Sequence, residues 1–88
     1  MKGEALHTEQ IILWDTEYGE VHCTLKDVMK KKKTTIYQLV RISGIKYDVI
    51  ERYYSDEVIR FDSNVLAKLC YSLDCDIGDV LKYQRSSW

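Results

Sequence analysis

The sequence predicts a mainly α-helical fold, a bundle of five short helices preceded by an N-terminal β-hairpin extension. The 88-residue chain has no proline and only four glycines, which favours helices over a turn-rich sheet. From position 24 onward, apolar residues recur at helical spacing. Capping residues and one glycine separate these periodic segments. We therefore expect one small domain over residues 24–83, an extension over 1–23 and a tail over 84–88.

The first predicted helix begins after Thr24, a suitable N-cap residue, and ends near Lys31. The residues spaced i, i+3 and i+4 on its apolar face are Leu25, Val28 and Met29. The run Lys30–Lys33 suits the negative end of the helix dipole. This run is equally consistent with an ordinary solvated helix end.

The second and third predicted helices meet at Gly44. Thr34 or Thr35 caps the second helix, which runs to about Ser43, and Gly44 ends it in the left-handed conformation. The third helix covers about 46–54. The apolar residues expected where the two helices cross are Val40, Ile45, Ile50 and Tyr53. This spacing is typical of a helix-turn-helix.

Two further helices are expected after a polar loop. Asp62 can cap a fourth helix that runs through Leu73. Its apolar face is expected to hold Val65, Leu66, Leu69, Cys70 and Leu73. Asp76 can cap a short fifth helix with Asp79 at its third position. The residues expected to turn inward there are Ile77, Val80 and Leu81.

The N-terminal extension shows strand-like patterns in place of helical ones. Ile11–Trp14 is a short apolar run, and residues 21–25 alternate between apolar and polar side chains. Asp15–Gly19 is turn-like, so we predict a β-hairpin. An isolated hairpin is marginal in water. It must therefore pack on the bundle or pair with a second copy of the chain.

Composition excludes several classes of function. The longest apolar run, Ile11–Trp14, is too short to span a membrane, and no secretory signal is visible, so we expect a cytoplasmic protein. Cys70 and Cys75 lack the partners of a zinc site, and His7 and His22 are interpreted as ordinary surface or hairpin residues. We expect no cofactor, metal, small-molecule ligand or enzymatic activity, since no nucleophile–base pair or glycine-rich phosphate loop is visible.

Charge is unevenly distributed along the chain. The formal net charge is −1, which argues weakly against nucleic-acid binding. However, residues 1–23 carry one lysine against five acidic residues, whereas residues 24–83 carry eleven basic against nine acidic residues. The helical part is therefore mildly basic.

The outward face of the third helix is predicted to be polar. It holds Lys46, Tyr47, Asp48, Glu51 and Arg52. Lys46 and Arg52 suit the acceptor atoms of guanine, while Asp48 or Glu51 could accept from the amino group of cytosine. Tyr54 flanks this face, where it could contact sugar and phosphate. Lys33 is a further candidate phosphate contact.

At this point the sequence resembles the Cro and lambda-repressor-like helix-turn-helix regulators, also called the XRE type. The resemblance covers residues 24–83 and rests on LVRISGI at the turn and FDSNVLAKLCYSLDCDIGDVLKY after it. It implies a DNA-binding transcriptional regulator, often a repressor and often a dimer on a palindromic operator. By motif position, Tyr47, Asp48, Glu51 and Arg52 would face the groove. The residues implied near phosphate are Thr35, Tyr37, Gln38 and Ser55.

The sequence departs from the family pattern at several polar positions. Ile36 stands where the family often has glutamine, Lys46 where serine or threonine commonly caps the helix, and Asp56 where glycine is frequent. Our leading hypothesis is a sequence-specific DNA-binding regulator, a repressor acting as a homodimer through the hairpin or the tail Tyr83–Trp88. The alternative is a protein-interaction module of the same fold. A negative patch formed by Asp48, Glu51, Asp56 and Glu57 would favour that alternative.

Overall fold

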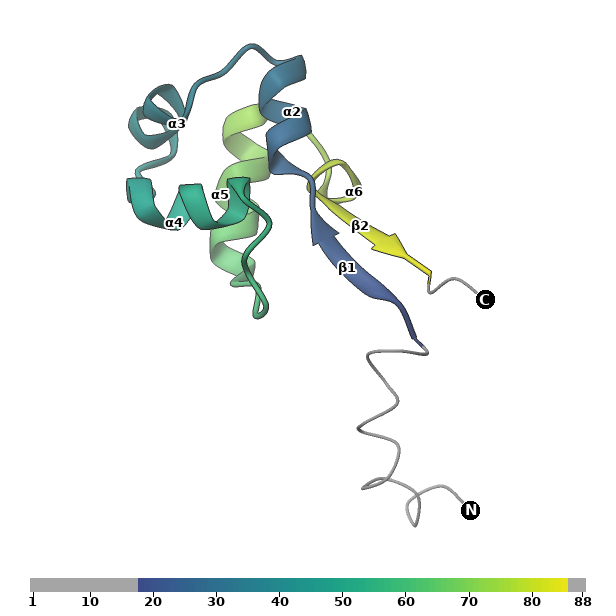
Figure 1. Ribbon diagram of the computed structural model, residues 1–88. Coiled ribbons are helices and arrows are strands. Elements are labelled where there is room, and N and C mark those ends of the chain that lie inside the picture. The colour runs from purple at the N-terminus through teal and green to yellow at the C-terminus, as the bar shows by residue number, and fades with distance from the viewer. Residues whose placement is uncertain (1–17, 86–88) are drawn as a thin grey trace.

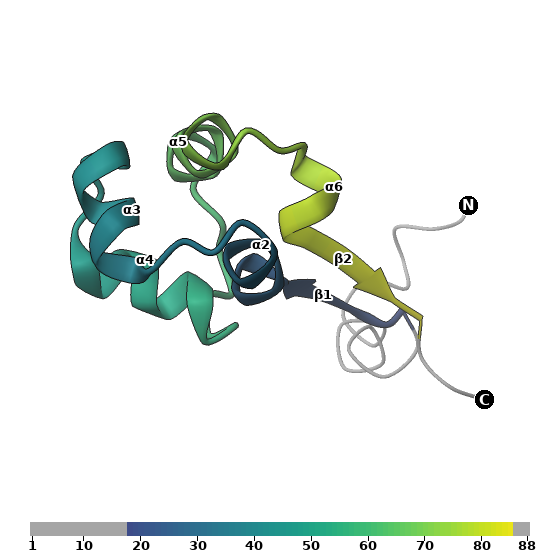
Figure 2. The ribbon, with the colours of Figure 1, turned by 90° about the horizontal axis from the view of Figure 1, so that it is seen from above.

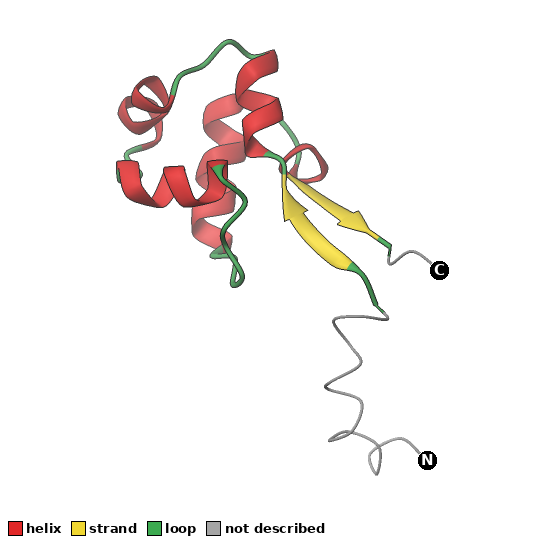
Figure 3. Cartoon of the chain, viewed as in Figure 1, coloured by secondary structure: helices red, strands yellow, loops and turns green. Residues whose placement is uncertain are grey.

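The computed structural model describes residues 18–85 and shows a helical bundle with a two-stranded β-ribbon at one end (Figures 1 and 3). Over these residues the elements occur in the order β1, α2, α3, α4, α5, α6, β2. Their bounds are Glu20–Cys23, Leu25–Lys31, Ile36–Ser43, Tyr47–Tyr54, Ser63–Leu73, Ile77–Val80 and Leu81–Gln84. The prediction of a mainly helical fold with five helices is confirmed, and the first four helices begin and end within about a residue of their expected limits. The fifth helix begins after Asp76 as expected, but Leu81, which was expected on it, is the first residue of β2. No helix within these residues is long and apolar enough to cross a membrane.

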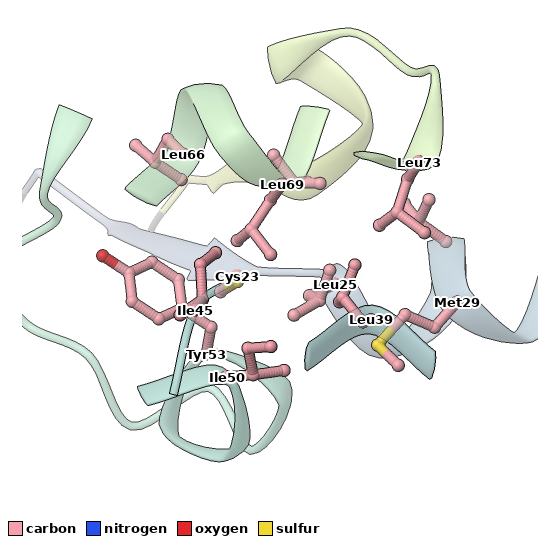
Figure 4. Packing of buried hydrophobic residues seen from close by; sticks show 12 residues of the cluster. Cys23, Leu25, Met29, Leu39, Ile45, Ile50, Tyr53, Leu66, Leu69 and Leu73 are labelled. Carbon is pink, nitrogen blue, oxygen red and sulfur yellow. The ribbon is translucent and has the colours of Figure 1, made fainter. Parts of the chain in front are cut away.

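The core lies where all five helices meet (Figure 4). Each helix contributes one side chain with no exposed area: Leu25, Leu39, Ile50, Leu69 and Val80. Burying such a side chain stabilises the fold by about 1.5–3 kcal/mol relative to exposure. The apolar spacing in the sequence therefore identifies the helix faces that pack together. Ile77 is an exception, because the prediction that it turns inward is wrong and its side chain is 51% exposed.

The turn between α3 and α4 has the expected left-handed glycine. Gly44 has φ of 76° and donates its N–H to the carbonyl of Val40 over 2.9 Å. A Cβ atom on this glycine would meet no heavy atom within 4 Å. Glycine is thus favoured here by the backbone angle and not by a lack of space. Ser43 adds a second constraint, since its Oγ donates to Leu39 O over 2.7 Å and accepts from Ile45 N over 3.1 Å.

The strand predicted in the extension is present as β1, and within residues 18–85 its partner is β2. The two strands pair antiparallel, with Val21 opposite Tyr83 and Cys23 opposite Leu81. The other half of the predicted hairpin, Ile11–Trp14, lies outside the described residues. Part of the segment expected to be a tail is therefore a strand, and the ribbon joins the two ends of the domain.

The ribbon projects from the bundle on the side away from α3 (Figures 1 and 2). Its base is fastened at Thr24, which was predicted to cap the first helix. No side-chain cap bond forms there. Instead, Thr24 N donates to Val80 O and Thr24 Oγ1 donates to Asp79 O, both over 2.7 Å. These bonds join the start of α2 to the end of α6.

Candidate nucleic-acid interface

The first turn of α3 is held by a reciprocal capping box. Gln38 N donates to Thr35 Oγ1 over 3.1 Å, and Thr35 N donates to Gln38 Oε1 over 2.9 Å. These bonds satisfy two backbone N–H groups that a helix start leaves unpaired. They also occupy the acceptor oxygens, so the Thr35 hydroxyl and the Gln38 amide NH₂ remain as donors. Both residues are exposed, as a phosphate contact requires.

The face of α4 opposite the core holds four of the five residues predicted to contact bases. Ile50 and Tyr53 are buried against the bundle, which turns the opposite side of α4 to solvent. The exposed residues there are Tyr47, Asp48, Glu51 and Arg52. The fifth residue, Lys46, is also exposed but lies just before the helix, as its N-cap. Their contact with bases stays a prediction.

The charged groups on this face are not paired with one another. Asp48 and Arg52 lie one turn apart on α4, yet no salt bridge joins charged side chains of this helix in the described part of the chain. Asp48 and Glu51 occupy the middle of the exposed face, with Tyr47 on one flank and Arg52 on the other. The carboxylates and the guanidinium are therefore available to an external ligand.

Two aromatic rings connect α3 to α4 beside this face. The ring centroids of Tyr37 and Tyr47 lie 5.2 Å apart at an interplanar angle of 40°. Burial, followed by the neighbouring Tyr37 hydroxyl and the Glu51 carboxylate, raises the pKa of the Tyr47 phenol. The two rings line a shallow, mostly apolar hollow together with Val40 and Arg41.

Arg41 is a candidate contact that our sequence reasoning missed. It lines the aromatic hollow on one side and a second hollow on the other, where its neighbours are Lys33, Thr34, Gln38 and Ile42. Two cations and an amide donor therefore gather beside the start of α3. Its spacing could have identified it. Arg41 lies four residues after Tyr37 and three after Gln38, so it shares a helix face with two residues that were already predicted to contact phosphate.

Tyr54 and Ser55, the last two predicted phosphate contacts, lie at the end of α4. Tyr54 is half-buried, and the Lys26 ammonium of α2 lies 5.7 Å from the centre of its ring. This cation–π geometry stabilises the pair modestly. Ser55 is exposed and donates its N–H to Glu51 O over 2.9 Å. Tyr54 is thus turned partly toward α2, whereas Ser55 is open to a ligand.

Asp56 follows α4 in a left-handed conformation, with φ of 60°. A non-glycine residue in this region costs about 1–2 kcal/mol, which explains why glycine is frequent here in the family. The Asp56 side chain offsets this cost through β1. Its Oδ1 accepts from Cys23 N and its Oδ2 contacts His22 Nδ1, both over 2.7 Å. His22 is therefore more than the ordinary surface residue that we expected.

The position of Asp56 also bears on the alternative function. A negative patch needs the carboxylates of Asp48, Glu51, Asp56 and Glu57 to act together. The Asp56 carboxylate is engaged by β1, since the Cys23 N–H, followed by His22, holds its pKa below the usual value and keeps it ionised. Its charge is directed toward β1, which weakens the case for one patch that runs from the α4 face to Glu57.

The cysteines behave as small hydrophobic residues. Cys23, Cys70 and Cys75 are free thiols. Burial and the adjacent Cys70 raise the pKa of the Cys75 thiol to about 11, which keeps it protonated and unreactive at neutral pH. Within residues 18–85, no group of three or more His, Cys, Asp or Glu side chains is arranged to hold a metal ion.

Comparisons with known proteins agree with this geometry. A family model described as the Cro/C1-type HTH DNA-binding domain matches residues 24–86. A crystal structure from Bacteroides fragilis, described as a "putative DNA-binding protein", has a similar fold with a TM-score of 0.63. The two chains are 21% identical, and the similarity covers 72% of this chain and 100% of that one. No curated protein matches the sequence.

Proposed function

Because the chain belongs to the family of Cro/C1-type helix-turn-helix DNA-binding domains, we propose that it is a sequence-specific transcriptional regulator. In this proposal α4 inserts into the major groove of double-stranded DNA, and the regulator is a cytoplasmic homodimer that represses transcription. The observation that carries the proposal is the exposed face of α4. Its charged side chains have no ion-pair partner among the described residues, so they are free to meet base edges.

The side chains of α4 have complementary roles in this proposal. Arg52 and Lys46 donate to guanine O6 and N7, which are the usual targets of basic side chains in the major groove. Asp48 and Glu51 accept from the N4 amino group of cytosine. A carboxylate near phosphate is repelled unless it gains such a donor, so these two residues favour a base with an amino group in the major groove, which is cytosine in this proposal. Tyr47 lies at the edge of these base-contacting side chains and contacts the groove there.

The residues around the start of α3 hold the DNA backbone. Lys33 and Arg41 supply positive charge beside the hollow that they line. The Thr35 hydroxyl and the Gln38 NH₂ supply neutral donors, since their acceptor atoms are already used in the capping box. Further contacts are assigned to Tyr37, Tyr54 and Ser55. Such contacts fix the orientation of a protein on DNA without reading its sequence.

The β-ribbon is the proposed dimer contact. Of the two regions that the sequence suggested for this role, the N-terminal extension supplies β1 and the C-terminal tail supplies the last two residues of β2, Tyr83 and Gln84. The cross-strand pair Val21 and Tyr83 is 52% and 61% exposed, and Tyr18 nearby is 55% exposed. A two-stranded ribbon with an exposed apolar pair gains stability when a second copy covers it.

A repressor of this kind acts by occupying its site. A dimer that spans two half-sites about 34 Å apart covers at least one turn of the duplex. Polymerase cannot bind the same stretch at the same time, so transcription from an overlapping promoter falls. Two copies also double the number of base contacts, which a single short helix cannot supply.

Selection from random duplex DNA tests the proposal. The full chain is expected to enrich a palindromic motif with guanine or cytosine at conserved positions in each half-site. The same selection with Arg52→Ala, a change on the exposed face of α4, is the matched control and is expected to lose one of those positions. Absence of any enriched motif would contradict DNA recognition and favour a protein-interaction module, whose specific support is the pair of acids in the middle of the α4 face.

A further inference from the structure

A set of ionisable side chains outside the DNA-facing surface connects the end of α4 to the β-ribbon. His22 on β1 contacts Asp56, the second residue after α4, and the two are separated by 34 positions in the sequence. Asp56 is itself fixed to α4, because its N–H donates to Tyr53 O over 3.2 Å and the next N–H, of Glu57, donates to Arg52 O over 3.0 Å. A displacement of the Asp56 side chain is therefore expected to shift the last turn of α4 as well.

Both nitrogens of the His22 ring face carboxylates. Nδ1 lies 2.7 Å from Asp56 Oδ2, and Nε2 lies 3.1 Å from Glu20 Oε1. A neutral imidazole carries one N–H and can satisfy only one of these contacts, whereas the imidazolium satisfies both. The arrangement consequently favours the protonated ring.

The remaining groups around His22 come from β2. Lys82 lies directly opposite His22 in the strand register, but its ammonium donates to the carbonyl of Gly78 in α6. Gln84 of β2 is a neutral neighbour that favours the charged ring. The hydrogen bond that His22 donates to Asp56 is the largest cause of the raised pKa of His22.

We propose that His22 and Asp56 form a proton-dependent clamp that positions the C-terminal end of α4 against β1. When His22 is protonated, the clamp holds the DNA-facing helix in a fixed orientation relative to the ribbon. When the proton leaves, the single remaining N–H is shared between Asp56 and Glu20, and α4 loosens in the tautomer whose N–H faces Glu20, because the Asp56 contact then has no donor. Because the ribbon is the proposed dimer contact, the clamp sets the relation between the two DNA-facing helices, and this last step rests on the proposed function.

The first test follows the imidazole signals of the full chain by NMR in the absence of DNA. In the native chain His22 is expected to titrate above 6.5, the ordinary value for histidine, and the amide signals of residues 47–56 are expected to shift with the His22 midpoint. The clamp would be overturned if the titration midpoint of His22 were that of an ordinary histidine, or if the amide signals of α4 did not change at the His22 midpoint.

Asp56→Gly distinguishes the clamp from a merely structural turn. Glycine suits the left-handed backbone at this position, so the variant should fold, yet it lacks the carboxylate. Asp56→Asn keeps the size of the side chain and removes its charge. Both variants are expected to lower the His22 midpoint and to uncouple α4 from it. Native titration behaviour in both variants would refute the assignment.

The last measurement uses DNA. With the enriched duplex at constant salt, raising the pH through the His22 midpoint should weaken specific binding of the native chain several-fold and of Asp56→Asn much less. Equal pH dependence in the two proteins would overturn the link between clamp and DNA binding. A chain that binds no specific duplex at any pH would refute the proposed function, while the NMR titrations would still decide whether the clamp exists.

Discussion

The rings of Tyr37 and Tyr47 lie 5.2 Å apart, and this contact joins the first turn of α3 to the first turn of α4. The pair stands at the edge of the proposed DNA surface, where Tyr37 is 72% exposed. We expect this ring contact to support the turn between the two helices.

A double-mutant cycle on these rings should measure their coupling. Tyr37→Ala and Tyr47→Ala are each expected to destabilise the fold, with a coupling energy of about 0.5–1.5 kcal/mol in urea unfolding. The control is Tyr71→Ala on α5, whose side chain is 89% exposed, and a change within about 0.5 kcal/mol is expected. Additive effects of the two substitutions would show that the rings do not support the turn.

Substitutions of Gly44 should separate backbone strain from crowding. Gly44→Ala is expected to cost about 1–2 kcal/mol because alanine resists the left-handed conformation. Gly44→Asn should cost less, since asparagine adopts this conformation more readily and a Cβ here meets no neighbour within 4 Å. Thermal or urea unfolding of both variants provides the measurement. An equal loss in both would indicate a steric origin instead.

Two arginines near the proposed interface should affect DNA binding differently. Arg52→Ala, on the exposed face of α4, is expected to weaken specific binding by about 1–3 kcal/mol and to relax the preference at one base position. Arg41→Ala should weaken binding to all sequences alike. It should also reduce the slope of the logarithm of the binding constant against the logarithm of the salt concentration by about 1. Lys33→Ala should behave like Arg41→Ala.

Binding measured at several salt concentrations, on specific and scrambled duplexes, separates these effects. Lys68→Ala on α5 is the matched control, because it removes one exposed positive charge from another helix. Its salt slope should stay native. If Arg52→Ala keeps full sequence preference, Arg52 does not read a base.

Gly19 should be essential to the ribbon and therefore to the proposed dimer. It has φ of 86°, and a Cβ atom there would approach Gln84 O to 2.3 Å. Gly19→Ala is expected to break the pairing of β1 with β2 near its open end and to shift the protein toward monomer in analytical ultracentrifugation. Gly78→Ala is the matched control, since a Cβ there has free space. A native dimer in Gly19→Ala would contradict a dimer contact at the ribbon.

The stability of the fold should depend on pH through His22 and Asp56. The pKa of His22 is raised from 6.5, so its contribution is fully present below that value and is lost as the pH rises through the folded pKa. The pKa of Asp56 is lowered from 3.8, so its contribution is present above that value and is lost as the pH falls through the folded pKa. The pair therefore contributes most between these two ordinary values.

Urea midpoints measured from pH 3 to 9, as a series of about one-unit steps, test this dependence. Asp56→Asn should reduce the change of the urea midpoint with pH on both the acidic and the alkaline side. Asp48→Asn is the control, because Asp48 is exposed and has no ion pair in the described part of the chain. A native curve for Asp56→Asn would show that these two side chains are not linked to folding.

The sequence by itself determined the helices, the turn and the exposed face of α4. These features depend on residues close in the chain. The spacing of Leu25, Val28 and Met29, the capping box at Thr35 and the left-handed Gly44 are local, and helical periodicity fixes which side of α4 is buried once Ile50 and Tyr53 enter the core.

Only the tertiary structure decided how the ends of the chain meet and what surrounds α4. The partner of β1 is about 60 residues away, and many pairings satisfy the same alternating pattern. The contacts of Asp56 with His22 and Cys23 of β1 likewise join segments that no local spacing relates. Local geometry determines each helix, whereas contacts between distant residues depend on how the packed core sets the helices against one another.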